Sequence, residues 1–127
     1  PPLGPLRFVS DDGFPILVGR NNVQNDRLTL KTARGSDVWF HAKNIPGSHV
    51  IVVTEGRTPP DRTLEQAAML AALHSKAAES AQVPVDYTAV RHVKKPAGAK
   101  PGMVIYETNQ TAYVTPDPLL AQRLKSD

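Results

Sequence analysis

Side chains that can contact nucleic acid occupy every second position of one short segment: Trp39, His41 and Lys43. Apolar side chains alternate with them at Val38, Phe40 and Ala42. Successive side chains of a strand point to opposite faces of a sheet, so the two sets lie on opposite faces. If the apolar set faces the core, the only tryptophan lies outward beside a cation and an imidazole, as on surfaces that stack unpaired bases. The alternative is that the long helix covers this face and Trp39 belongs to the core.

A basic loop is the second candidate site. Residues 91–102 contain four lysines or arginines and one histidine, and no acidic residue interrupts them. Such a cluster points to an anionic partner. Gly98 and Gly102 would let the backbone approach a phosphate chain that Lys94, Lys95 and Lys100 neutralise. The alternative is a solvated loop between two strands, where exposed lysines are common.

A segment rich in side-chain amides is the third candidate. Between Arg20 and Arg27 it contains Asn21, Asn22, Gln24 and Asn25. Amides offer hydrogen-bond donors and acceptors together, which suits RNA contacts. They suit helix capping and buried hydrogen bonds equally well. Asp26 is expected to orient Arg20 or a backbone amide rather than to touch a ligand.

Other chemistry finds little support in the sequence. His41 and His49 flank a turn near Asp37, but no third metal ligand follows at a suitable spacing. Ser48 and His49 are adjacent on a strand, so their side chains diverge and cannot form a nucleophile–base pair. None of the common hydrolase, nucleotide-binding or zinc-protease motifs is present. We therefore expect no catalysis, no cofactor and no metal site.

Length and composition set the remaining limits. The chain has 127 residues, a net charge of +3 and no cysteine, which indicates one domain without disulfides. No apolar run approaches the roughly 18 residues of a membrane span, and the start does not resemble a signal peptide. We expect a cytoplasmic protein without membrane contact. The first residue is not methionine, which suggests an excised fragment.

The apolar pattern predicts an α+β domain with a mostly antiparallel sheet, one long Ala-rich helix and a short helix packed on it. The long helix should cover residues 64–81, begin with a capping box of Thr63 and Gln66, with Asp61 as a competing cap, and stop before Pro84. The short helix should cover residues 21–30, capped by Asn21 or Asn22. The predicted strands are residues 6–10, 14–18, 37–43, 48–54, 85–93, 103–108 and 111–115, with hairpins joining the first two and the last two. Residues 116–127 are predicted to be a tail with one helical turn.

In order along the chain, six motifs resemble the NFACT-R domain, also known as DUF814. The motifs are Gly19–Thr29, Asp37–Lys43, Ile45–Val50, the alanine pairs at 67–68 and 71–72, Val83–Thr88 and Lys95–Gly102. The resemblance covers roughly residues 6–115. Residues 1–5 would then be a disordered or vector-derived start, and residues 116–127 a C-terminal tail.

The resemblance implies an RNA-binding module of a ribosome quality-control factor of the RqcH type. Such factors bind tRNA and the rRNA of the large ribosomal subunit and support alanine tailing of stalled chains, together with other domains that are absent here. The alternative is a protein–protein or adhesin-like module that binds fibronectin or docks the rest of the factor. The candidate RNA-contacting residues are Arg20, Asn21, Asn22, Gln24, Asn25, Lys31, Trp39, His41, Lys43, His49, Lys94, Lys95 and Lys100.

Overall fold

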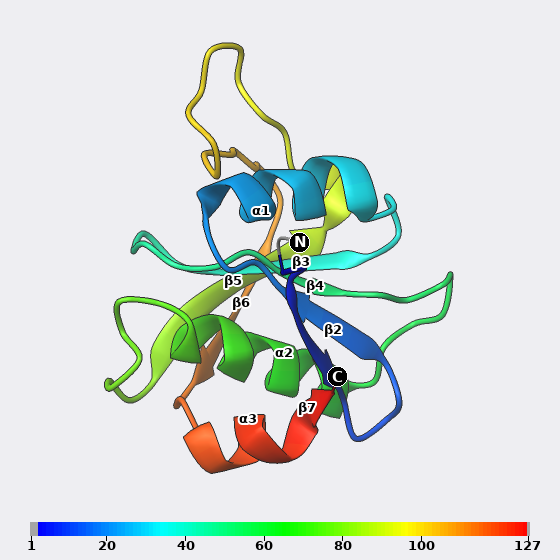
Figure 1. Ribbon diagram of the computed structural model, residues 1–127, viewed down its shortest axis with the longest axis vertical. Helices are drawn as coiled ribbons and strands as arrows, with labels where there is room; N and C mark the ends of the chain where they lie inside the picture. Colours follow the sequence, from blue (N-terminus) through cyan, green and yellow to red (C-terminus); the bar gives the residue numbers. More distant parts are fainter. Residues whose placement is uncertain (1–2, 127) are drawn as a thin grey trace.

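A seven-stranded antiparallel sheet organises the computed structural model, which describes residues 3–126 (Figure 1). The strand order is β6-β5-β3-β4-β2-β1-β7. The strands are β1 (Leu6–Val9), β2 (Pro15–Val18), β3 (Val38–Ala42), β4 (Val50–Val52), β5 (Val83–Ala89), β6 (Gln110–Val114) and β7 (Lys125–Ser126). The helices are α1 (Asn22–Arg27), the π-helical η1 (Leu28–Thr32), α2 (Asp61–Leu73), the 3-10 turn η2 (Val90–His92) and α3 (Pro118–Leu124). The predicted α+β class, antiparallel sheet and β1–β2 hairpin are confirmed.

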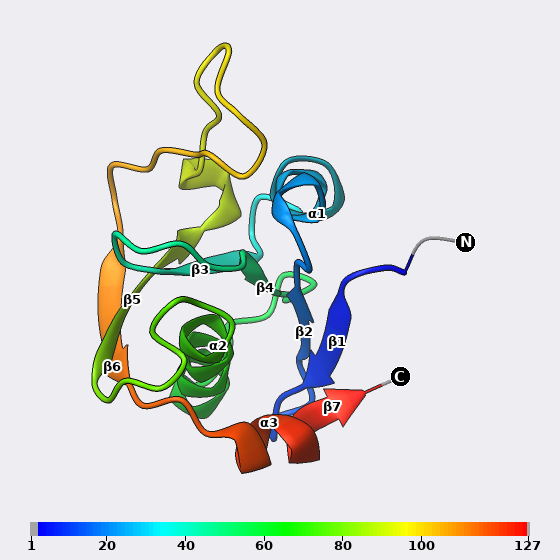
Figure 2. The ribbon, with the colours of Figure 1, turned by 60° about the vertical axis from the view of Figure 1, so that its left-hand side comes forward.

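Both faces of the sheet are covered, but by different kinds of structure. Figure 1 shows α2 and α3 below the sheet, and α1 with the loop of residues 94–102 above it; Figure 2 shows the same division from the side. The α2 side holds the larger apolar core, in which Phe40, Ile16 and Leu70 are fully buried. The α1 side holds a smaller core around Trp39 and Ile51. We call the part of the molecule on this face of the sheet the α1 side, and the part on the opposite face the α2 side.

Helix α2 is shorter than the sequence predicts. It ends at Leu73 after 13 residues, so the prediction of one long helix over residues 64–81 is wrong. Small side chains let it sit close on the sheet, since Ala67, Ala68, Ala71 and Ala72 are all fully buried. The residues after Leu73 favour a helix by type, but their backbone forms hydrogen bonds to another segment instead. Ser48 N–H donates to the His74 carbonyl, and Lys76 N–H donates to the Pro46 carbonyl. Among residues 3–126, no helix combines the length and the apolar character needed to cross a membrane.

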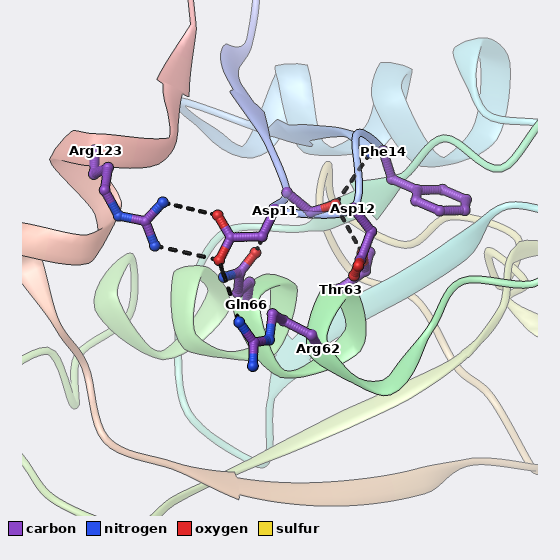
Figure 3. Close-up of polar contacts among 8 residues, drawn as sticks. Asp11, Asp12, Phe14, Arg62, Thr63, Gln66 and Arg123 are labelled. Carbon is purple, nitrogen blue, oxygen red and sulfur yellow. Dashed lines mark hydrogen bonds and ion pairs between the residues drawn. The ribbon is translucent and has the colours of Figure 1, made fainter.

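The predicted capping box of α2 is also wrong. Pro60 is the N-cap residue and provides no side-chain hydrogen bond. The Thr63 hydroxyl donates to Asp12 (2.8 Å), and Gln66 donates to Asp11 (2.7 Å), so both side chains bind the β1–β2 turn instead (Figure 3). Asp11 also accepts from Arg123 of α3 (2.8 Å), and this hydrogen bond is the main reason that the Asp11 pKa falls to about 2. The turn therefore ties α2 to α3.

The C-terminal third departs most from the predicted elements. Strand β6 pairs with β5, whereas residues 103–108 form no strand beyond a single bridge between Lys94 and Ile105. The predicted hairpin of residues 103–108 with 111–115 is therefore wrong. Residues 103–106 instead cross the α1 side, where the Tyr106 hydroxyl donates to Asp86 (2.6 Å). The predicted tail forms α3, capped by Asp117, and β7, which pairs with β1.

The first residues lie against α1. The Leu3 carbonyl accepts from Gln24, and the Gly4 carbonyl accepts from Arg20, each at 2.7 Å. Residues 1–2 of the predicted disordered start lie outside the described residues.

Candidate nucleic-acid interface

The thirteen residues selected from the sequence come from segments of the α1 side. The segments are Arg20 with α1, η1, β3 with the residue after it, the residue before β4, and the basic loop of residues 94–102 (Figure 1). They are far apart in sequence and meet because the central strands bring α1 and the loop over one face of the sheet. The structure separates them into residues that hold this side together and residues that remain open to a ligand.

Trp39 belongs to the first group. Its exposed fraction is 1%, so the predicted outward, base-stacking tryptophan is wrong. The alternation itself is correct, because Phe40 lies in the core of the α2 side and Trp39 in that of the α1 side. The cover is not the long helix that the alternative interpretation invoked. It comes from Leu28 at the start of η1 and from Tyr106, whose ring centroid lies 4.9 Å from that of Trp39.

His49 is the buried polar centre of the α1 side. Its Nδ1 accepts from Trp39 Nε1 (3.1 Å) and from the Thr29 hydroxyl (2.7 Å), so its Nε2 carries the proton and donates to the Gly102 carbonyl (3.0 Å). Burial lowers the His49 pKa to about 4, and the ring is neutral at pH 7. Both ring nitrogens are occupied, so His49 joins β4, η1 and the basic loop.

His41 lies at the edge of this centre. Its ring stacks on Trp39 with 5.8 Å between centroids and 8° between planes, and Nδ1 donates to the Ala42 carbonyl (2.6 Å). Burial also lowers the His41 pKa. The ring is half-buried and remains partly open to a ligand. Within the part of the chain that the structure describes, histidines and acidic residues form no group of three that could hold a metal ion.

The amide-rich segment is largely structural. The Asn21 side chain accepts from Gln24 N–H (2.9 Å) and caps α1, as predicted, while Gln24 Oε1 accepts from Arg20 N–H (2.8 Å). Asn25 is buried, and its Oδ1 accepts from the backbone N–H of His49 (3.1 Å). A Cβ at Gly19 would overlap this oxygen, so only glycine fits there. Asn22 is exposed; its Oδ1 accepts from Asn25 Nδ2 at 3.5 Å, and the rest of its amide group remains available to a ligand.

We expect Asn25→Ala to lower the free energy of unfolding by about 1–3 kcal/mol, because the His49 amide is left buried without its acceptor. Asn22→Ala is the matched control and should change stability little, since its side chain is exposed. Chemical denaturation of the two variants measures the difference. Equal stabilities would contradict the structural role of Asn25.

The basic loop is fastened to α1 by one carboxylate. Asp26 accepts from the Gly102 amide (2.7 Å) and from Lys95 Nζ (3.2 Å), which confirms that it orients a backbone amide. Lys95 also donates to the Lys100 carbonyl (2.6 Å), so its ammonium group is already bound within the domain. Lys94 and Lys100 are exposed, and neither forms an ion pair within residues 3–126. These two lysines are the open cations of the loop.

Lys43 is paired with a second carboxylate, that of Asp86, which is buried. Asp86 is 2% exposed and accepts from Tyr106 (2.6 Å), from Thr111 (2.7 Å) and from Lys43 Nζ (3.4 Å). Burial and the Asp86 carboxylate raise the Tyr106 pKa, so the phenol stays protonated. The Lys43 side chain is still 42% exposed. Arg20 and Lys31 are exposed further along the α1 side.

A cavity of about 450 Å³ opens between the turn of residues 44–47 and residues 101–104, where the basic loop ends. We call it the turn–loop cavity. It is lined by Asn22, Trp39, His41, Asn44, Ile45, Pro46, Gly47, His49, Pro101, Gly102, Met103, Val104 and Tyr106. Four of these were among the sequence candidates, whereas Asn44, Met103 and Tyr106 were missed. A cavity of about 570 Å³ under η1 contains none of the candidates.

The missed residues carried weak sequence signals. Asn44 begins the turn that leads into the Ile45–Val50 motif, and its positive φ of 57° is unusual for a residue other than glycine. Met103 and Tyr106 lie just after the basic loop, in the segment of residues 103–108 that the sequence pattern predicts to be a strand. In the structure, Met103, Val104 and Tyr106 of this segment line the turn–loop cavity.

Comparisons with known proteins agree on one family. The family model described as the NFACT protein RNA binding domain matches residues 5–108. The Rqc2 homolog RqcH of Bacillus subtilis is 50% identical over 118 residues, which cover 93% of this chain and 20% of that protein. The RqcH of Streptococcus suis is 50% identical over 113 residues, covering 88% of this chain and 20% of that protein. The chain thus spans about a fifth of these relatives.

A more distant relative and a solved structure extend the match. Ribosome quality control complex subunit 2 of Schizosaccharomyces pombe is 36% identical over 80 residues, which cover 60% of this chain and 8% of that protein. The solved C-terminal part of the fibronectin/fibrinogen-binding protein of Streptococcus suis is 44% identical with a TM-score of 0.94. That match covers 99% of this chain and 51% of the solved chain.

Proposed function

The chain belongs to the NFACT RNA-binding domain family, and we propose that it binds RNA through the α1 side of its sheet. The observation that carries this proposal is how the charges lie on that side. Asp26 and Asp86 are paired with lysines, whereas Lys94 and Lys100 project from the loop without an acidic partner in the described residues. Where the acidic side chains are already paired with cations, the remaining exposed cations form a surface that attracts phosphates.

We further propose that the RNA is tRNA or rRNA of the large ribosomal subunit. The name of one relative supports this choice, since the Schizosaccharomyces pombe protein is named as a subunit of the ribosome quality control complex. In a longer protein of that kind, the domain would hold RNA while other domains support alanine tailing. We propose that the domain itself holds RNA without catalysing a reaction.

We expect the double variant Lys94→Ala/Lys100→Ala to weaken RNA binding without lowering the melting temperature. Each lost phosphate contact should flatten the plot of log K against log salt concentration by roughly 0.7–0.9. Lys95 is left intact, because its removal would also free Asp26 and the loop. Fluorescence anisotropy with labelled tRNA and a large-subunit rRNA fragment at several salt concentrations measures both the affinity and the slope.

The matched control removes two positive charges from the α2 side. Arg62 is exposed on α2, and Lys125 lies over the Phe8 ring on that side. Arg62→Ala/Lys125→Ala should leave the slope unchanged. Equal losses in both double variants would show that only net charge matters and would contradict the assigned surface.

Fibronectin is the second arm of the same experiment, because it appears in the name of the solved neighbour. Salt-insensitive binding to fibronectin, with no RNA bound at low salt, would replace the RNA proposal by a protein–protein function. RNA binding that weakens steeply with salt would support the proposal.

A further inference from the structure

The turn–loop cavity has walls that are fixed before any ligand arrives. On the loop wall, Gly102 has φ of +85°, its amide donates to Asp26 and its carbonyl accepts from His49. A Cβ at Gly102 would lie 2.9 Å from the Asn22 side chain, which is too close. Glycine at this position therefore lets the loop backbone pack against α1. On the turn wall, Gly47 is bridged to Ser75. A preformed cavity loses little freedom when a ligand enters.

The interior of the cavity is uncharged at neutral pH. Among its thirteen lining residues, the only titratable side chains are those of Tyr106, His41 and His49, and all three are neutral at pH 7. Burying a phosphate or a metal ion in such a lining would be costly, because no opposite charge compensates for its lost hydration. A flat, neutral group with polar edges meets no such cost.

The accessible lining matches a heteroaromatic ring. The rings of His41 and Tyr106 are half-buried, and Met103 at the rim is 60% exposed. The amide side chains of Asn22 and Asn44 are exposed at the two walls and offer both donors and acceptors. Aromatic faces with nearby amides are how proteins hold the unstacked bases of single-stranded RNA.

The cations stand outside the cavity, next to its walls. Lys43 precedes Asn44 on the turn wall, and Lys100 precedes Pro101 on the loop wall. Both are exposed, so a strand could keep its phosphates at the rim while one base enters. We propose that the turn–loop cavity receives one unstacked nucleobase of the bound RNA, an inference that rests on the proposed RNA-binding function.

The test compares two strands that carry the same phosphates. One is a ten-nucleotide single-stranded RNA, used as oligo(A) and as oligo(U), and the other is a fully abasic ribose-phosphate strand of equal length. We expect the intact domain to bind at least one base-bearing strand roughly 5- to 100-fold more tightly than the abasic strand, the range for a stacked base. The ratio of the two affinities isolates the contribution of the bases from that of the phosphates.

Two variants should reduce this ratio toward one while leaving the affinity for the abasic strand unchanged. Met103→Ala removes the apolar rim, and Asn44→Gly removes one amide at a position whose positive φ glycine adopts freely. Leu119→Ala is the control, because Leu119 is 78% exposed on α3 and far from the cavity in the fold. Lys94→Ala/Lys100→Ala should lower the affinity for both strands by equal factors, so the ratio of the two affinities should not change.

The outcomes separate the two proposals. Salt-dependent binding of RNA with a ratio near one in the intact domain would overturn the base cavity and leave RNA binding in place. A high ratio that Met103→Ala and Asn44→Gly do not reduce would also overturn it, since the base would then bind elsewhere. Failure of both strands to bind at low salt would overturn the proposed function and this inference together.

Discussion

Replacing Trp39 by alanine should lower the free energy of unfolding by about 3–5 kcal/mol, the usual cost of removing a buried aromatic side chain. The indole is 1% exposed and fills the space between β3 and Tyr106. Its loss also leaves His49 Nδ1 without one of its two donors. Urea denaturation followed by circular dichroism measures the change without relying on tryptophan fluorescence.

Two observations on the parent protein accompany this prediction. Because Trp39 is the only tryptophan, its emission should be blue-shifted in the folded state and insensitive to iodide. Tyr113→Ala is the control, since that aromatic ring is 66% exposed on β6, and its removal should change stability little. Iodide quenching of Trp39, with an unchanged melting temperature in Trp39→Ala, would contradict the buried position.

Lowering the pH from 6.5 to 4 should destabilise the domain by on the order of 3 kcal/mol through His49. In the folded state the His49 pKa is about 4, whereas an unfolded histidine titrates near 6.5. Between these values the unfolded chain binds the proton and the folded chain does not, so stability falls as the pH falls. The contribution is fully present above pH 6.5 and is lost by about pH 4.

The groups around His49 explain its lowered pKa, and the His49→Gln variant tests their effect. Burial is the largest cause of the lowered pKa; of the charged and titratable groups near the ring, His41 and Lys95 also disfavour its protonation, and Asp26 favours it. His41 should add to the slope in the same direction, because burial lowers its pKa too. His49→Gln should be less stable at pH 7 but lose less stability between pH 6.5 and 4. A parent-like slope in His49→Gln would refute the assignment.

The fold follows from the sequence where local pattern and tertiary structure agree. Period-two alternation placed β3 correctly, and Asn21 caps α1 as its residue type suggests. The pattern failed at the end of α2, where alanine favours continuation of the helix but residues 74–76 bind the turn of residues 46–48. It failed again at residues 103–108, where a bridge from Ile105 to Lys94 and a hydrogen bond from Tyr106 to Asp86 of β5 replace the local hairpin.

At the candidate site, too, the local sequence pattern does not reveal the tertiary contacts of each side chain. Lys94 and Lys95 are neighbours in a basic run, yet only Lys95 is bound, because Asp26 lies 69 residues away in sequence and adjacent in space. Alternation puts Trp39 opposite Phe40 but cannot reveal that η1 and Tyr106 cover the second face. The thirteen candidates thus lie on one side of the molecule. Only tertiary contacts separate the residues that build it from those that remain open.

The pairing of β7 with β1 has a mechanical consequence. The two strands are antiparallel, with Arg7 opposite Ser126 and Phe8 opposite Lys125, so the start of β1 and the end of β7 lie at the same end of the ladder. Tension applied across the two ends of the domain would load these hydrogen bonds one after another, as in opening a zipper, and not all at once in shear. The C-terminal segment should therefore peel away at low force, resisted by the buried side chains of Ala121 and Leu124 and by the Arg123–Asp11 ion pair, while the loop and α1 above the far face stay in place.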